Sequence, residues 1–182
     1  MHKSKGFVAA VAFVMTLAMA ACASTRTQKS PGEAVDDSVT TGRVKAALIA
    51  DPTTKAHQID VETFKGTVQL NGFVDSSASK ERASEVARGT KGVNKVQNNL
   101  TVKTDPRTAS DVVDDSAITV KVKAALAGDP RTKAHQVNVE TREGVVQLSG
   151  FVDNSEAKST AEELARAVDN VKSVDNELSV KK

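Results

Sequence analysis

The sequence of 182 residues contains no tryptophan, no tyrosine and only five phenylalanines. Proteins that bind single-stranded nucleic acids combine aromatic stacking platforms with a positively charged groove. Charge is balanced here, with 25 basic and 23 acidic residues, and loss of Lys3 and Lys5 with a cleaved N-terminal segment leaves the remainder neutral. These absences exclude nucleic acid as an expected partner.

A hydrophobic run long enough to cross a bilayer is also missing. Residues 7–21 form an apolar stretch of fifteen, broken only by Thr16, whereas a hydrocarbon layer of ~30 Å needs about 20. Basic residues precede this stretch and small residues follow it. Residues 1–21 are therefore predicted to be a secretory signal peptide.

Cysteine occurs once, directly after the apolar stretch. The sequence around Cys22 resembles a bacterial lipobox, whose cysteine is lipidated with fatty acids such as palmitate and becomes the first residue of the mature chain. The alternative is ordinary cleavage after Ala20, which leaves a free thiol near the new terminus. A thiol in a flexible tail has no fixed base beside it, so Cys22 is not expected to be catalytic.

The small, polar residues after the cysteine predict a flexible tether, so that residues 22–34 comprise the lipidated cysteine and its tether. Ala23 follows the cysteine in place of the aspartate that resembles an inner-membrane retention signal. The expected location is therefore the periplasmic side of the outer membrane, and the soluble periplasm is the alternative.

The rest of the chain is an internal duplication. The stretch from Lys55 to Asp75 returns 78 residues later, and residues 35–103 align with residues 113–181 without a gap, with 40 of 69 pairs identical. A period this long indicates a duplicated domain and not a solenoid. We predict one domain over 35–103, a linker over 104–112 and a second domain over 113–182.

Hydrophobic periodicity predicts the same elements in both copies. In the first, Asp36 and Asp37 are N-cap candidates for a helix that Asp51-Pro52 ends. Alternating residues then flank a two-residue turn at Lys65-Gly66, and a second helix and a third strand follow. The expected class is α+β, with two tandem helix–strand–strand–helix–strand domains. Each has a three-stranded mixed sheet and two helices on one face.

The hairpin pattern G-x-V-x-L-x-G-x-V and the ending V-x-x-V-x-N-x-L-x-V occur in both copies. With the element order and the secretion signal, they resemble the BON domain over nearly all of residues 35–182. The resemblance implies a two-domain secreted protein similar to osmotically inducible periplasmic proteins or to outer-membrane lipoproteins that bind anionic phospholipid. It also marks four glycines as backbone positions: Gly66, Gly72, Gly144 and Gly150.

Motifs for catalysis are absent from the sequence: it has no nucleophile elbow, no phosphate loop and no Cys/His pair. His57 and His135 recur before the first strand of each copy, without the clustered ligands that zinc requires. They are interpreted as surface or turn residues, with metal binding or pH sensing as the alternative. The protein is expected to be no enzyme, to need no cofactor and to hold no metal.

Phenylalanines occupy polar strand faces. Phe73 and Phe151 alternate with core valines, and Phe64 falls on the same side, where Arg142 replaces it in the second copy. An exposed phenylalanine on a sheet is expected to be covered. Three alternatives remain at this point: a bulge that turns the ring inward, packing between the two copies, or a partner protein.

The first helix of each copy carries cations beside an apolar stripe, where anionic headgroups could bind at about 1 kcal/mol per charge. The alternative is a solvated polar face. Opposite charges of the copies, +2 over 35–103 and −2 over 113–182, suggest that they attract each other. The headgroup candidates are Lys121, Lys123, Arg131 and Lys133, with Arg43 and Lys45 in the first copy.

Three functions fit these features. The first is a lipid-anchored periplasmic protein that binds anionic phospholipid or envelope proteins and supports outer-membrane integrity or the osmotic-stress response. The second is a soluble periplasmic stress protein that binds unfolded or partner proteins through a phenylalanine-bearing sheet face. The third, a solute-binding module, requires a pocket that the sequence does not reveal.

Overall fold

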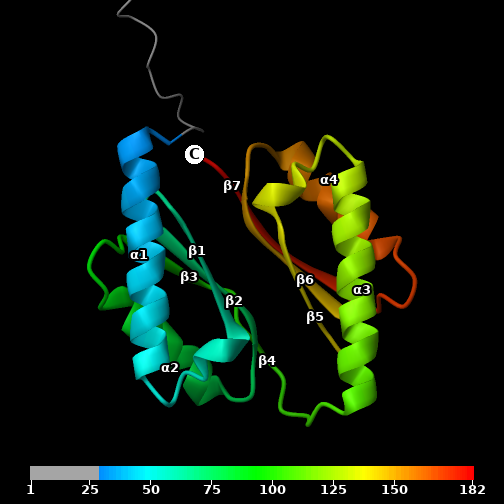
Figure 1. The fold of residues 1–182 in the computed structure, drawn as a ribbon, viewed down its shortest axis with the longest axis horizontal. Coiled ribbons are helices and arrows are strands. Elements are labelled where there is room, and N and C mark those ends of the chain that lie inside the picture. Colours follow the sequence, from blue (N-terminus) through cyan, green and yellow to red (C-terminus); the bar gives the residue numbers. More distant parts are fainter. Residues whose placement is uncertain (1–28) are drawn as a thin grey trace, which may run out of the picture.

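The computed structural model describes residues 29–182, so the signal-peptide prediction and Cys22 lie outside the described residues. Each copy forms a mixed sheet covered on one face by two helices, which confirms the predicted α+β class. The sheet has three strands in the second copy and four in the first, where the expected third strand is split in two. Figure 1 shows the two sheets next to each other at the centre, with α1 and α3 on opposite flanks. None of the described helices is long and apolar enough to span a membrane.

The first domain runs from α1 to a split third strand. Its elements are α1 (Pro31–Ala50), a 3₁₀ turn (Ala56–Gln58), β1 (Ile59–Phe64), β2 (Thr67–Val74), α2 (Ser77–Arg88), β3 (Lys95–Asn98) and β4 (Thr101–Val102). The central strand β2 pairs antiparallel with β1 and parallel with β3 and β4. The helical crossover before the third strand permits this parallel pairing, as the sequence predicted.

The second domain repeats this order with an unbroken third strand. Its elements are α3 (Ala109–Gly128), a 3₁₀ turn (Ala134–Gln136), β5 (Asn138–Arg142), β6 (Val145–Val152), α4 (Ser155–Arg166) and β7 (Ser173–Val180). Again the middle strand, β6, pairs antiparallel with β5 and parallel with β7. Each domain has its own core, in which Val44 and Leu48 or their repeats Val122 and Leu126 pack on the sheet.

Both first helices begin earlier than the sequence analysis expected. Ser30 caps α1 through a capping box with Glu33, and Pro31 occupies the first turn, where its missing N–H costs nothing. Thr108 and Asp111 form the same box on α3. The expected tether and linker are therefore too long at their C-terminal ends, since residues 31–34 and 109–112 are helical.

The aspartates expected to cap these helices have a different role. Asp37 lies inside α1, where its carboxylate accepts hydrogen bonds from the backbone N–H groups of Lys65 (2.7 Å) and Gly66 (2.9 Å). Asp115 binds the equivalent turn of the second hairpin, at Glu143 and Gly144. Both turn residues have positive φ, 48° and 72° in the first copy, as a two-residue type I′ turn requires. Each aspartate thus joins its first helix to its hairpin.

Candidate functional site

The two domains meet through the polar faces of their sheets. The Gln69 side chain crosses from β2 and accepts a hydrogen bond from the Gly150 N–H at 3.0 Å, and Gln147 crosses from β6 to accept one from the Gly72 N–H at 2.6 Å. Both glutamines are almost fully buried, with exposed fractions of 0% and 1%. The contacts are reciprocal, so an approximate twofold relation connects the domains, and buried amide groups fix their register.

The backbone conformation at this interface requires glycine at two positions. Gly72 and Gly150 have φ values of 113° and 122°, which side chains rarely adopt. A Cβ atom on Gly72 would lie 2.4 Å from the carbonyl oxygen of Gln58, and one on Gly150 would lie 2.3 Å from that of Gln136. These positions let the N–H of each glycine reach the opposite domain's glutamine.

One end of the interface is closed by the interdomain linker, and we call it the Arg142 end. The buried Arg142 guanidinium donates hydrogen bonds to the carbonyl oxygens of Lys103 (3.1 Å) and Asp105 (2.8 Å). Its charge is balanced by Asp75 and Glu143 at 3.6 Å. Arg142 therefore holds the linker against the second sheet.

The other end, which we call the Phe64 end, has a phenylalanine where the repeat has this arginine. The Phe64 ring stacks on Phe151 across the domains, with centroids 5.3 Å apart. Three ammonium groups lie 5.0 to 5.8 Å from the Phe64 centroid: those of Lys29, Lys65 and Lys181. Neither domain's core includes Phe64, Phe73 or Phe151. Phe64 and Phe151 thus pack between the copies, and Phe73 and Phe64 are each only 7% exposed.

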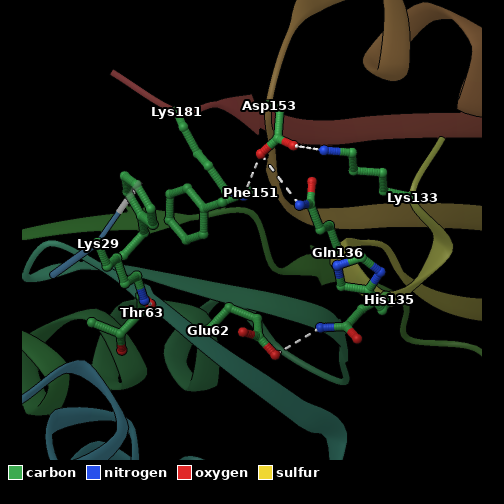
Figure 2. Close-up of a pocket in the computed structure, with 11 residues that line it drawn as sticks. Lys29, Glu62, Thr63, Lys133, His135, Gln136, Phe151, Asp153 and Lys181 are labelled. Carbon is green, nitrogen blue, oxygen red and sulfur yellow. Dashed lines mark hydrogen bonds and ion pairs between the residues drawn. The ribbon is translucent and has the colours of Figure 1, made fainter. Parts of the chain in front are cut away.

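A hollow of about 570 Å³ opens at the Phe64 end and is lined by both domains. Figure 2 shows Asp153 in its upper wall, bound by Lys133 (2.5 Å) and Gln136. The hydrogen bonds from Lys133 and then from Lys181 (2.6 Å) hold the pKa of Asp153 far below its ordinary value. On the opposite wall Glu62 accepts a hydrogen bond from Asn138 of the second domain at 2.9 Å. The lining is polar, and most of its charged groups are paired within the protein.

The outward faces of α1 and α3 carry exposed apolar residues, which we call the stripe of each helix. On α3, Val113 is 67% exposed and Val120 is 66% exposed. On α1, the equivalent stripe includes Val35 at 62%, Val39 at 43% and Ile49 at 74%. The opposite faces of the same helices are buried on their own sheets. The two stripes therefore face away from the centre of the molecule on opposite flanks (Figure 1).

The family model described as "BON domain" matches residues 36–104 and residues 114–182. The chain belongs to the BON-domain family. It is 43% identical over 152 residues to "Osmotically-inducible protein Y" of Escherichia coli, covering 82% of this chain and 75% of the relative.

Two further relatives align over a similar length. The chain is 34% identical over 148 residues to "Outer membrane lipoprotein DolP" of Haemophilus influenzae and 32% identical over 148 residues to "21 kDa hemolysin" of Actinobacillus pleuropneumoniae. Each alignment covers 80% of this chain and 75% of the relative. Each alignment is about twice as long as one BON domain, so the likeness is not confined to a single copy.

The six cations that were expected to contact lipid headgroups differ in their exposure and in their ion pairs. Lys121 and Lys123 are exposed beside the α3 stripe and form no ion pair within residues 29–182. Arg131 binds Asp129 at 2.6 Å, and Lys133 binds Asp153. On α1, Arg43 is exposed and Lys45 lies 3.5 Å from Asp60. The structure thus separates these candidates: Lys121 and Lys123 lie on the α3 helix, Arg43 and Lys45 lie on α1, and Lys133 lines the hollow between the domains.

The recurring histidines lie in the 3₁₀ turn before the first strand of each BON domain, and both are exposed. His135 lines the hollow at the Phe64 end. Among residues 29–182, no group of three or more His, Cys, Asp or Glu side chains is placed to hold a metal.

Sequence reasoning did not single out Gln69 and Gln147, which join the two BON domains. Their signal was present: an identical glutamine stands at the same place on the polar face of both hairpins, three residues before Gly72 and Gly150. A long amide can reach across a sheet-to-sheet interface and bond backbone groups. A polar residue repeated on a face that must be covered is therefore a candidate interface residue.

Proposed function

We propose that this chain is a non-catalytic, lipid-anchored envelope protein that faces the periplasm and contacts anionic phospholipid through the outward face of α3. The observation that carries this proposal is the exposed stripe of Val113 and Val120 beside Lys121 and Lys123, which form no ion pair with any residue that the structure describes. Lys121 and Lys123 are two residues apart in α3, so they flank the stripe on its two sides. A helix with an apolar stripe between basic side chains can lie in the membrane interface with the stripe in the headgroup region. Each lysine adds about 1 kcal/mol at an anionic surface.

The lipid anchor would supply the second contact. The segment from Cys22 to the residue before Lys29 has seven residues. A chain of that length extends at most ~25 Å. Two modest membrane contacts combine because the first raises the effective concentration of the second. A weak helix face is therefore sufficient to orient the folded domains on the membrane.

The relatives support an envelope role of this kind. One is named as an outer membrane lipoprotein and another as osmotically inducible, and we extend both attributes to this chain as outer-membrane maintenance during osmotic stress. The second candidate function, a soluble periplasmic stress protein that binds other proteins, is favoured by the higher identity to the osmotically inducible relative. In that case the sheet faces are not its binding surface, because the docked domains bury Phe64 and Phe73.

Fractionation of cells that express Cys22→Ser separates these two candidates. We expect the wild-type chain in the outer-membrane fraction and the variant in the soluble periplasm. A wild-type chain that is already soluble would contradict the anchor. It would leave the soluble stress protein as the function.

Flotation with vesicles tests the lipid contact without the anchor. The chain over residues 22–182 with Cys22→Ser should float with phosphatidylglycerol-containing vesicles at low salt and less at physiological salt, because salt screens the lysines. Lys121→Glu with Lys123→Glu should abolish flotation. The matched pair on the other flank, Arg43→Glu with Lys45→Glu, should leave most of it. Equal flotation of the α3 variant and the wild type would rule out this helix as the contact.

A further inference from the structure

A second hollow, of about 450 Å³, lies on the other side of the Phe64–Phe151 pair and is lined by lysines. We call these five residues the lysine cradle: Lys65, Lys95, Lys158, Lys181 and Lys182. No aspartate or glutamate is among the residues that line this hollow. Two lysines come from the first domain and three from the second, so the cradle exists only when the domains are docked.

Most of the positive charge in the cradle is not neutralised by the protein. Lys158 donates a hydrogen bond to the Leu178 carbonyl oxygen at 2.7 Å, and its charge acts on Glu162, one turn further along α4, without a direct ion pair. Lys95 and Lys182 are exposed, and neither they nor Lys158 forms an ion pair within the described residues. Lys181 is bound by the carboxylate of Asp153, and the charge of Lys65 acts on Glu33, so the excess positive charge of the cradle rests on Lys95, Lys158 and Lys182. Gathered like charges favour a bound anion, which balances them.

The duplication provides an internal comparison at the opposite end of the interface. The repeat aligns Lys65 with Glu143, Lys95 with Ser173 and Lys182 with Thr104. There Glu143 binds Lys103 at 3.2 Å, and Arg142 holds the linker over the site. Three of the cradle lysines are thus replaced by uncharged or acidic residues at the Arg142 end. The lysine cluster is therefore a feature of the Phe64 end and not a general property of the fold.

We propose that the lysine cradle is a binding site for phosphate groups. Lysine binds phosphate as a point charge, and several lysines around one hollow fit a ligand with more than one phosphate oxygen exposed. The chain enters the fold at the same end, since Lys29 lies 5.0 Å from the Phe64 ring and donates to the Thr63 carbonyl oxygen. Two sources offer such groups: the headgroups of a membrane, if the proposed anchor holds this end near it, or a soluble phosphoanion.

Titration with tripolyphosphate and flotation with vesicles test the two sources. The probe protein is the chain over residues 22–182 with Cys22→Ser. We expect Lys95→Glu with Lys158→Glu to weaken tripolyphosphate binding about tenfold or more. The matched control, Lys80→Glu with Lys172→Glu, changes the charge equally at sites outside the cradle and should bind as the wild type does. Circular dichroism confirms that both variants fold.

The outcomes separate this inference from the proposed function. If the cradle variant loses both tripolyphosphate and phosphatidylglycerol vesicles, the cradle binds lipid phosphates; if it loses tripolyphosphate alone, the ligand is a soluble phosphoanion. Either result supports the site. Equal tripolyphosphate binding by the cradle variant and the wild type, or no binding by the wild type, overturns it. The α3 lipid contact can survive that failure, because Lys121→Glu with Lys123→Glu tests it on vesicles alone.

Discussion

Replacing Gln147 by alanine should weaken the docking of the two domains and so lower the free energy of unfolding. The amide of Gln147 accepts from the Gly72 N–H at 2.6 Å and donates to the Asn99 carbonyl oxygen at 2.8 Å. The variant leaves the buried Gly72 N–H without a partner, at a cost of about 1–3 kcal/mol, and removes a second hydrogen bond worth about 1 kcal/mol. We expect the free energy of unfolding to fall by about 2–4 kcal/mol.

Urea unfolding of the chain over residues 22–182 with Cys22→Ser measures this loss. With a denaturant slope of about 2 kcal/mol/M, the midpoint should fall by roughly 1–2 M. The matched control is Gln136→Ala, whose amide contacts Asp153 at 3.2 Å near the surface, and it should shift the midpoint by less than about 0.5 M.

Hydrogen exchange locates the effect. In Gln147→Ala the amide proton of Gly72 should lose its protection, whereas that of Gly150, held by Gln69, should keep most of it. A midpoint within about 0.3 M of the wild type, with Gly72 still protected, would refute the reasoning. It would mean that the buried amides do not hold the domains together in solution.

Two further results are expected. Gly72→Ala should cost more than about 3 kcal/mol in urea unfolding, because its Cβ would meet the Gln58 carbonyl oxygen at 2.4 Å at a φ of 113°. In contrast, Gly42→Ala, in open space within α1, should stabilise by about 0.5–1 kcal/mol; equal losses from both would contradict this account. Burial raises the pKa of Asp37, but hydrogen bonds from Lys29 and the turn amides outweigh it, so the pKa is lowered in the folded state. Its stabilisation is therefore present above the unfolded pKa of about 3.9 and lost as the pH falls further. When the pH is lowered through this range, the free energy of unfolding of Asp37→Asn should fall by less than that of the wild type. An identical fall in both proteins would refute this role of Asp37.

The candidate sites show where prediction from sequence stops. The sequence analysis predicted cations beside an apolar stripe on the first helix of each copy, but it did not identify the exposed residues Val113 and Val120. Arg131 and Lys133 were indistinguishable from Lys121 in sequence, yet in the structure they are bound by Asp129 and Asp153. Ion pairing depends on which carboxylate lies near a lysine in space, and Asp153 is 20 residues from Lys133.

The sequence by itself determined the duplication, the element order, the mixed sheet and the glycine turns, because these depend on local periodicity and backbone conformation. Helix starts were misplaced where a capping box competed with nearby aspartates. Only the tertiary structure decided that the polar sheet faces meet through Gln69 and Gln147, and that Phe64 leaves one end open where Arg142 closes the other. The lysine cradle depends on this docking. It combines residues more than 60 positions apart, whose shared field arises only when both domains are in place.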